Sequence, residues 1–166
     1  SSHITGLQAK QIMDKTRQQA KAITGAGAGN ILFTSGATEG IQTAILSALL
    51  HAKKTLGITA NNAKDYCLLY GATEHKAVPE SLKHWDELLE INAEIKAIPV
   101  DTMGQLDMDF IAKEVPNALM ICTMAVNNET GVYQDINLLD KTIRSNNPTT
   151  AWMVDCVQAL GKTNVD

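Results

Sequence analysis

The sequence has no surplus of basic residues and no apolar run of membrane length. Its 14 Lys and Arg residues are outnumbered by 18 Asp and Glu residues, giving a net charge of −4. That balance argues against nucleic acid as a partner, because no basic stripe offsets it. No stretch is apolar over the length needed to cross a membrane, and no signal peptide opens the sequence. We therefore expect no nucleic-acid or membrane partner and a cytoplasmic location.

Cysteine is also scarce. Cys67, Cys122 and Cys156 are an odd number, and they lie in largely apolar settings. This pattern favours reduced packing thiols in a cytosolic protein over a disulfide framework. No Cys–His spacing is typical of a zinc site, so we expect no bound metal.

What is present is an ordinary globular composition, with 166 residues of which 45% are hydrophobic and 19% charged. We expect a single domain over residues 1–166, although an incomplete one. Apolar strands are predicted at 31–33, 66–70, 94–100, 118–124 and 151–154. Helices are predicted at about 7–23, 37–52, 77–89, 107–115 and 136–144. Strands separated by helices predict the α/β class, with a mainly parallel sheet covered by helices on both faces.

The segment 31–40 carries the first functional signal. Three apolar residues are followed by Ser35-Gly36 and then by the helical pattern of Ile41, Ile45 and Leu49. A turn of small residues into a helix N-terminus is suited to binding phosphate. The glycine run at 25–29 precedes a predicted strand, so we interpret it as a flexible connection and not a dinucleotide motif.

Polar residues follow the predicted strands at four places: Ser35 to Thr38, Glu74-His75, Asn127-Asn128, and Asp155 with Gln158. In parallel α/β sheets, ligands bind beyond the carboxyl ends of the strands, so these loops are expected to meet in one crevice. Taken singly, His75 would be a loop or cap residue and the others turn formers. Their joint placement at strand ends favours a binding site.

These motifs resemble those of cysteine desulfurases, which are pyridoxal-phosphate (PLP) enzymes of the class V aminotransferase group. The resemblance rests on Thr34–Glu39, Glu74–Val78, Val126–Gly131 and Val154–Gln158, which stand in the family's order. Ser1-Ser2-His3 also resembles the end of a family segment. The resemblance covers the whole chain and implies part of the large domain of the aspartate-aminotransferase fold, PLP fold type I.

The resemblance also implies roles for residues of the first two motifs. Ala37 and Thr38 are similar to the family's cofactor-phosphate binders. His75 is similar to the residue that stacks on the pyridine ring, where an imidazole can also move protons as a catalytic group. Lys76 belongs to the earlier of two family His-Lys dipeptides and does not match the lysine that carries PLP.

The last two motifs imply ring contacts. Asn128 and Gln158 are similar to the partners of the ring and its O3 substituent. Asp155 is similar to the carboxylate that faces the pyridine nitrogen and keeps it protonated, which strengthens the ring as an electron sink.

By resemblance, we expect the cofactor-binding portion of an enzyme that converts L-cysteine to L-alanine with sulfur transfer, as used in iron–sulfur cluster assembly. In the family, the Schiff-base lysine and the persulfide cysteine lie downstream of the motif at Val154, so the 166-residue chain alone is expected to be inactive. Implied partners are cysteine or a similar amino acid, a sulfur-acceptor protein, and a second copy in a full-length homodimer. The open alternatives are another class V enzyme (a selenocysteine lyase or an aminotransferase) and a non-catalytic fragment that pairs with a partner chain.

Overall fold

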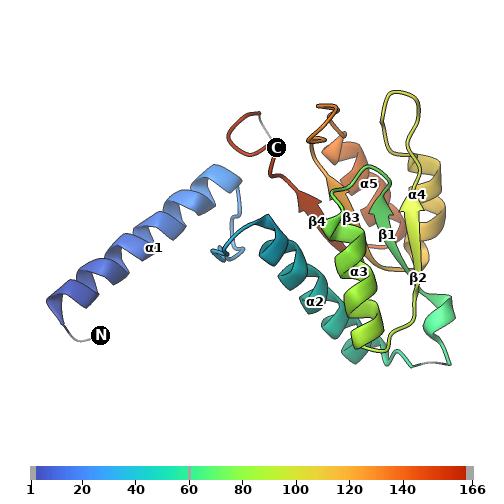
Figure 1. The fold of residues 1–166 in the computed structure, drawn as a ribbon, viewed down its shortest axis with the longest axis horizontal. Coiled ribbons are helices and arrows are strands. Elements are labelled where there is room, and N and C mark those ends of the chain that lie inside the picture. The colour runs from blue at the N-terminus through green and yellow to red at the C-terminus, as the bar shows by residue number, and fades with distance from the viewer. Residues whose placement is uncertain (1–2, 60, 164–166) are drawn as a thin grey trace. The chain divides into compact units, whose positions relative to one another are not determined.

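The computed structural model describes residues 3–59 and 61–163. The chain divides into two compact units, one ending at Ser35 and the other beginning at Gly36 (Figure 1). Among the described residues, no helix combines the length and apolarity needed to cross a membrane.

The first unit is built around one long helix, α1 (Ile4–Thr24). It ends at Gly25, whose left-handed backbone (φ 62°) lets the N–H of this residue bond to the carbonyl of Lys21. Several of the apolar residues that predicted this helix are exposed, among them Ile12 at 66% and Ile23 at 71%. The helix predicted at about 7–23 is therefore confirmed.

The strand expected at residues 31–33 is absent, and this prediction was wrong. These residues are irregular, and Leu32 and Phe33 are exposed. A strand needs a neighbour for its backbone hydrogen bonds, and the strands of the described chain all belong to the second unit. Within the first unit, the Phe33 ring instead lies 5.9 Å from the Arg17 guanidinium carbon.

The second unit contains a parallel four-stranded sheet, as expected. Its strands are β1 (Cys67–Gly71), β2 (Glu94–Ile98), β3 (Ala118–Met124) and β4 (Ala151–Asp155), in the order β2-β1-β3-β4. All seven residues of β3 are buried, since this central strand is covered on both faces. The structure therefore confirms the α/β class predicted from alternating apolar strands and helices.

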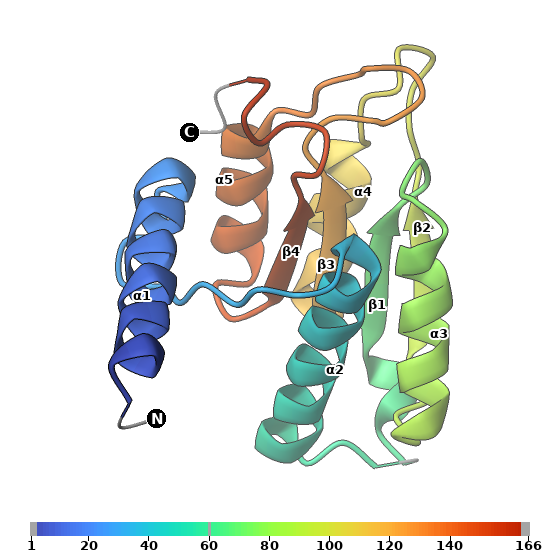
Figure 2. The ribbon, with the colours of Figure 1, turned by 60° about the vertical axis from the view of Figure 1, so that its left-hand side comes forward.

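Two helices cover each face of this sheet (Figure 2). The helices α2 (Ala37–Leu56) and α3 (Ala77–Leu88) pack on one face, and α4 (Met108–Glu114) and α5 (Ile136–Asn146) on the other. Short 3₁₀ turns occur at Ala63–Asp65 and Val115–Asn117. Aspartate residues cap the amino ends of α4 and α5. The Asp107 and Asp135 side chains each accept a backbone N–H of the first turn at 2.9 Å.

Helix α2 sets the position of the predicted phosphate-binding turn. Its residues Ile41, Ile45 and Leu49 are buried, and each such burial contributes about 1.5–3 kcal/mol to stability. Its last turn, with Thr55, borders a groove shared with Ala118 at the amino end of β3. The helix therefore runs antiparallel to the strands, and its amino end lies toward their carboxyl ends (Figure 2).

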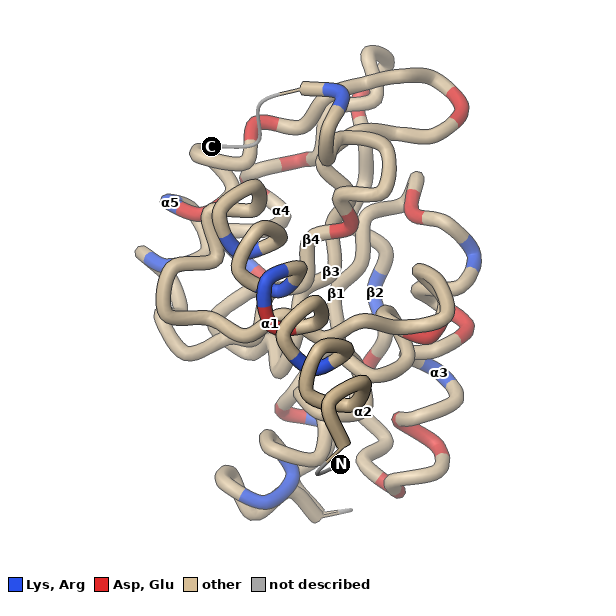
Figure 3. Tube along the Cα trace, turned by 90° about the vertical axis from the view of Figure 1, so that its left-hand side faces the viewer, with Lys and Arg blue, Asp and Glu red and all other residues tan. Residues whose placement is uncertain are grey.

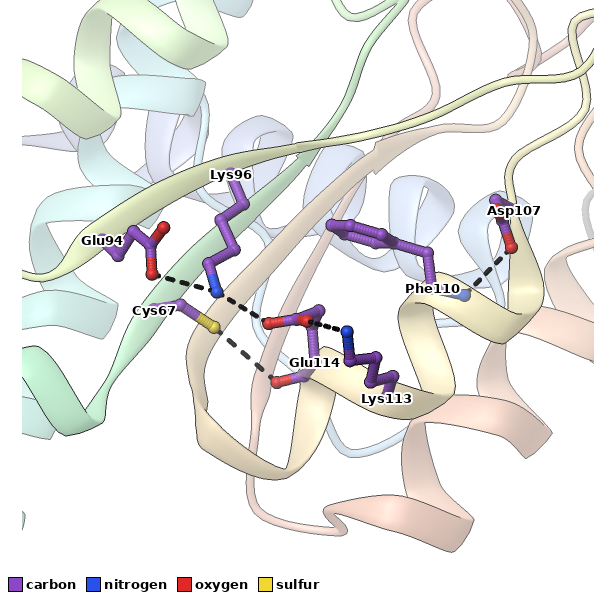
Figure 4. A network of polar contacts seen from close by, with 7 residues as sticks. All are labelled: Cys67, Glu94, Lys96, Asp107, Phe110, Lys113 and Glu114. Atoms are coloured by element: carbon purple, nitrogen blue, oxygen red, sulfur yellow. Dashed lines mark hydrogen bonds and ion pairs between the residues drawn. The ribbon is translucent and has the colours of Figure 1, made fainter.

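The outer strand β2 carries a charged cluster that protects its edge. The Lys96 ammonium lies 3.0 Å from the Glu94 carboxylate and 2.8 Å from that of Glu114 on α4 (Figure 4). The hydrogen bond from Lys96 holds the pKa of Glu114 below its ordinary value. Elsewhere, acidic and basic positions are interspersed along the trace, so neither sign is confined to one part of the chain (Figure 3).

Candidate functional site

The chain leaves the carboxyl ends of the two central strands toward opposite faces of the sheet, and a crevice opens there. After β1 the chain enters α3 on one face of the sheet, whereas after β3 it continues to α5 on the other face. This is the topological switch point at which α/β sheets bind ligands. The crevice has a volume of about 560 Å³ and is lined by residues 72–76 after β1 and 127–130 after β3.

Asn127 organises the loop after β3. Its side chain is buried (8% exposed), and Nδ2 donates to the Thr73 carbonyl at 3.0 Å across the crevice. Its Oδ1 accepts the N–H groups of Glu129 and Thr130 at 2.9 and 2.8 Å. One amide therefore shapes its own turn and joins it to the loop after β1, leaving the neighbouring Asn128 exposed toward the crevice.

A second amide braces this loop from outside. Gln134 is buried, its Oε1 accepts the N–H of Leu106 at 3.1 Å, and its Nε2 donates to the Gly104 carbonyl at 2.7 Å. Gly104 has φ +80° and lies against Val132, so this close approach needs a residue without a side chain. The loop bearing Asn127 and Asn128 is thus held at both ends before any ligand arrives.

His75 lies in the crevice with an exposed side chain. Its Nδ1 accepts the N–H of Ala77, in the first turn of α3, at 3.2 Å. A neutral imidazole that accepts at Nδ1 carries its proton on Nε2. The α3 amino end therefore fixes the tautomer and leaves Nε2 as the nitrogen for contact with a ligand.

Glu74 is a half-buried acid of the crevice, and its carboxyl oxygen Oε2 is fully buried. Its Oε1 accepts the N–H of Met124, the last residue of β3, at 2.6 Å, while Oε2 is buried and has no hydrogen-bond partner within residues 3–59 and 61–163. Loss of water around the carboxyl group raises its pKa to about 8, against a smaller lowering by the Met124 N–H, and the nearby charge of Asp155 adds to the rise. Its surroundings therefore favour the neutral form of the carboxyl group over the charged one.

Asp155 ends β4 directly beside Met124 in the sheet register. Its carbonyl accepts the N–H of Ala125 at 2.9 Å, and its Oδ1 accepts that of Val157 at 2.9 Å. The side chain is only half-buried, and its charge acts on Glu74. Three adjacent strand ends, those of β1, β3 and β4, thus contribute to one polar region.

The other residues implied by resemblance lie at the same edge of the sheet by topology. Ala37 and Thr38 open α2, whose first intrahelical bond runs from the Gly40 N–H to the Gly36 carbonyl at 3.2 Å. The amides of Ala37 and Thr38 therefore have no acceptor within the helix. Gln158 lies in the turn after β4, where its Oε1 accepts a hydrogen bond from the Lys162 ammonium group at 2.6 Å.

The residues lining the crevice include His75 and Asn128, whereas Ala37, Thr38, Asp155 and Gln158 are not among them. A common pocket for all six residues therefore stays a prediction. Within residues 3–59 and 61–163, no group of three or more His, Cys, Asp or Glu side chains is arranged to hold a metal ion.

Sequence reasoning gave Glu74 and Asn127 no specific role. Glu74 was grouped with the polar residues after strands, but glutamate is ordinarily exposed, and nothing in its local sequence indicates burial. Asn127 and Asn128 are adjacent and identical in type, so sequence alone does not tell the structural residue from the exposed one. The available signal was an amide-rich turn directly after a fully apolar strand.

Known proteins resemble this chain in both sequence and fold. The chain is 31% identical to a selenocysteine lyase of Xenopus laevis, with 100% of the chain covering 42% of that protein. It is 33% identical to the cysteine desulfurase IscS of Haemophilus influenzae, with 99% covering 38%. A solved NifS-like protein superposes with a TM-score of 0.84 at 29% identity, and the match covers 98% of this chain and 42% of that protein.

The chain thus spans about two fifths of the length of these relatives. Cysteine desulfurases of this group are PLP-dependent and have PLP fold type I, to which the parallel sheet and its helices correspond. The family model of class-V aminotransferases matches residues 1–166. The chain belongs to the class-V aminotransferase family.

Proposed function

We propose that this chain forms the cofactor-binding part of a cysteine desulfurase, which uses PLP to convert L-cysteine to L-alanine with sulfur transfer. The observation that carries the proposal is the crevice at the switch point, where His75 and Asn128 face a ligand and Asp155 ends the neighbouring strand. The names of the relatives support the substrate class, since cysteine desulfurases recur among them.

The donors and acceptors at this edge of the sheet fit PLP chemically. The phosphate would take the amides of Ala37 and Thr38 at the positive end of the α2 dipole. The ring nitrogen would face the Asp155 carboxylate, whose negative charge favours a protonated pyridine. Asn128 and Gln158 carry amides suited to the ring O3.

When bound, PLP supplies an electron sink for an amino-acid substrate. Asp155 would hold the proton at the ring nitrogen. His75, with its proton on Nε2 because Nδ1 accepts the Ala77 N–H, would lie against the ring and offer its Nε2–H as a hydrogen-bond donor. The hydrogen bonds of Asn127 keep this geometry rigid, so little reorganisation is needed on binding.

The proposal is tested with the full-length protein. Purified with PLP, it should release alanine and a sulfide equivalent from L-cysteine. Bound PLP without alanine release would reject the desulfurase assignment while leaving the cofactor site standing. We also propose that the full-length protein is a cytoplasmic homodimer that passes sulfur to an acceptor protein.

A selenocysteine lyase is the second candidate. It is favoured by the Xenopus laevis relative, which the chain matches over its whole length at 31% identity. Parallel assays with L-selenocysteine and L-cysteine distinguish the two. Turnover of selenocysteine alone would favour the lyase, whereas turnover of cysteine at a comparable rate would favour the desulfurase.

A further inference from the structure

Two carboxyl groups near the ends of β3 and β4, those of Glu74 in the crevice and Asp155 beside it, have different hydrogen-bond partners. Glu74 reaches from the loop after β1 to the end of β3, where Oε1 accepts the Met124 N–H at 2.6 Å. Asp155 lies beside the same Met124 in the register of β3 and β4, and its Oδ1 accepts the Val157 N–H at 2.9 Å. Met124 is thus a common neighbour of the two residues, and the charge of Asp155 acts on Glu74.

Their surroundings differ as well. Glu74 Oε2 is buried and finds no hydrogen-bond partner in the described part of the chain, which makes a charge on this oxygen unfavourable. The Asp155 carboxyl group is half-buried. Two acids close together do not both ionise easily, and the better solvated one keeps the charge.

We propose that Glu74 is a positioning residue that stays a neutral carboxylic acid, its proton on Oε2, so that the negative charge of the Glu74–Asp155 pair is confined to Asp155. The inference deepens the proposed function and rests on it in one respect, namely that Asp155 serves the ring nitrogen of PLP. On that function, a single anion at Asp155 would face the protonated ring nitrogen of PLP.

Other titratable groups around Glu74 do not supply a compensating buried cation. The thiol of Cys122 faces it from β3 and is buried, and Glu74 helps to raise the pKa of that thiol. His75, Lys76 and Glu129 line the same crevice with exposed side chains. Among the described residues, the charge that acts on the pKa of Glu74 is the negative one of Asp155.

The test is an infrared difference spectrum of the full-length protein without PLP, so it does not depend on the proposed function. The spectrum of the parent minus that of Glu74→Gln should show the carbonyl band of a buried protonated acid at pH 7, lost at high pH. Glu129→Gln, which removes an exposed carboxyl group of the same crevice, should lack this band. A Glu74 that is already ionised at pH 7 would overturn the proposal.

A second variant tests the pairing itself. In Asp155→Asn the like charge is gone, so the Glu74 band should persist but disappear at a lower pH than in the parent. An unchanged midpoint of the Glu74 titration would show that burial alone holds the proton on Glu74. The proposal that Asp155 takes the charge of the pair would then be wrong. If a variant does not fold, selective ¹³C labelling of glutamate in the parent protein gives the same titration by carboxyl NMR. Failure to bind PLP, with both infrared results as expected, would reject the proposed function and leave this inference intact.

Discussion

The Asn127 side chain donates a hydrogen bond to the backbone carbonyl of Thr73 at 3.0 Å, joining the loop after β3 to the loop after β1. These two loops line the crevice. The bond crosses the switch point of the sheet, so the ligand-binding geometry depends on one buried amide that need not contact the ligand.

Replacing Asn127 with alanine should therefore lower the free energy of unfolding. The change removes the bond to Thr73 and leaves the Glu129 and Thr130 N–H groups without their acceptor. We expect a loss of about 2–3 kcal/mol, measured by urea denaturation. Asn128→Ala is the matched control, because that exposed side chain should cost less than about 0.5 kcal/mol. Equal losses for the two variants would contradict the assignment of Asn127 as the structural residue.

Because the pKa of Glu74 is raised in the folded protein, the free energy of unfolding should fall as the pH rises. The folded pKa of Glu74 is about 8, above its ordinary value of 4.5, so the folded state binds the extra proton between these values. The contribution is fully present below the ordinary pKa and is lost as the pH rises through the folded pKa.

Glu74→Gln should remove this pH-dependent loss of stability, because the glutamine amide is neutral at every pH. Relative to the parent, the variant should gain on the order of 2–3 kcal/mol between about pH 5 and about pH 8. Denaturation curves at a series of pH values measure the difference. A gap between parent and variant that stays constant with pH would show that Glu74 does not titrate in this range.

If the amino end of α2 binds the phosphate of PLP, a change at Thr38 should weaken the binding of phosphorylated ligands only. Thr38→Val keeps the backbone amide and the shape of the side chain but removes the hydroxyl, which would be a further donor to the phosphate, so PLP should bind about tenfold more weakly to the full-length protein, corresponding to about 1.4 kcal/mol. Pyridoxal, which lacks the phosphate, should bind parent and variant equally well. Titrations followed by absorbance give both affinities, and an equal loss for both ligands would place Thr38 away from the phosphate.

The cysteines of this chain should be slow to react. Burial raises the pKa of the Cys67 thiol to about 11 and also raises those of Cys122 and Cys156. Since the thiolate is the nucleophile, alkylation at neutral pH should be slow in the folded protein and fast after unfolding. Mass spectrometry should find Cys156, the least buried, modified first. Rapid labelling of Cys122 in the folded protein would contradict its burial.

Much of the fold follows from local sequence patterns. The apolar runs at Leu68 and Leu119–Ile121 predict buried central strands, and the spacing of Ile41, Ile45 and Leu49 predicts the buried face of α2. The segment at Leu32 and Phe33 is equally apolar but is not a strand, because pairing depends on a neighbour that its own sequence does not specify.

The site was predictable only in its outline. Polar residues after parallel strands indicate a crevice, and His75 and Asn128 do line it. The burial of Glu74 depends on the Met124 amide, 50 positions away in sequence, and on the end of β4 beside it. No local pattern contains such a contact, so the charge division within the crevice emerges only from the three-dimensional arrangement.

The central claim is that the amino end of α2 and the acid ending β4 serve one ligand. A crystal structure of the full-length protein with PLP tests it most directly. We predict the phosphate at the amides of Ala37 and Thr38, and the pyridine nitrogen within hydrogen-bonding distance of the Asp155 carboxylate. PLP bound elsewhere, or Asp155 turned away from the ring nitrogen, would contradict the account.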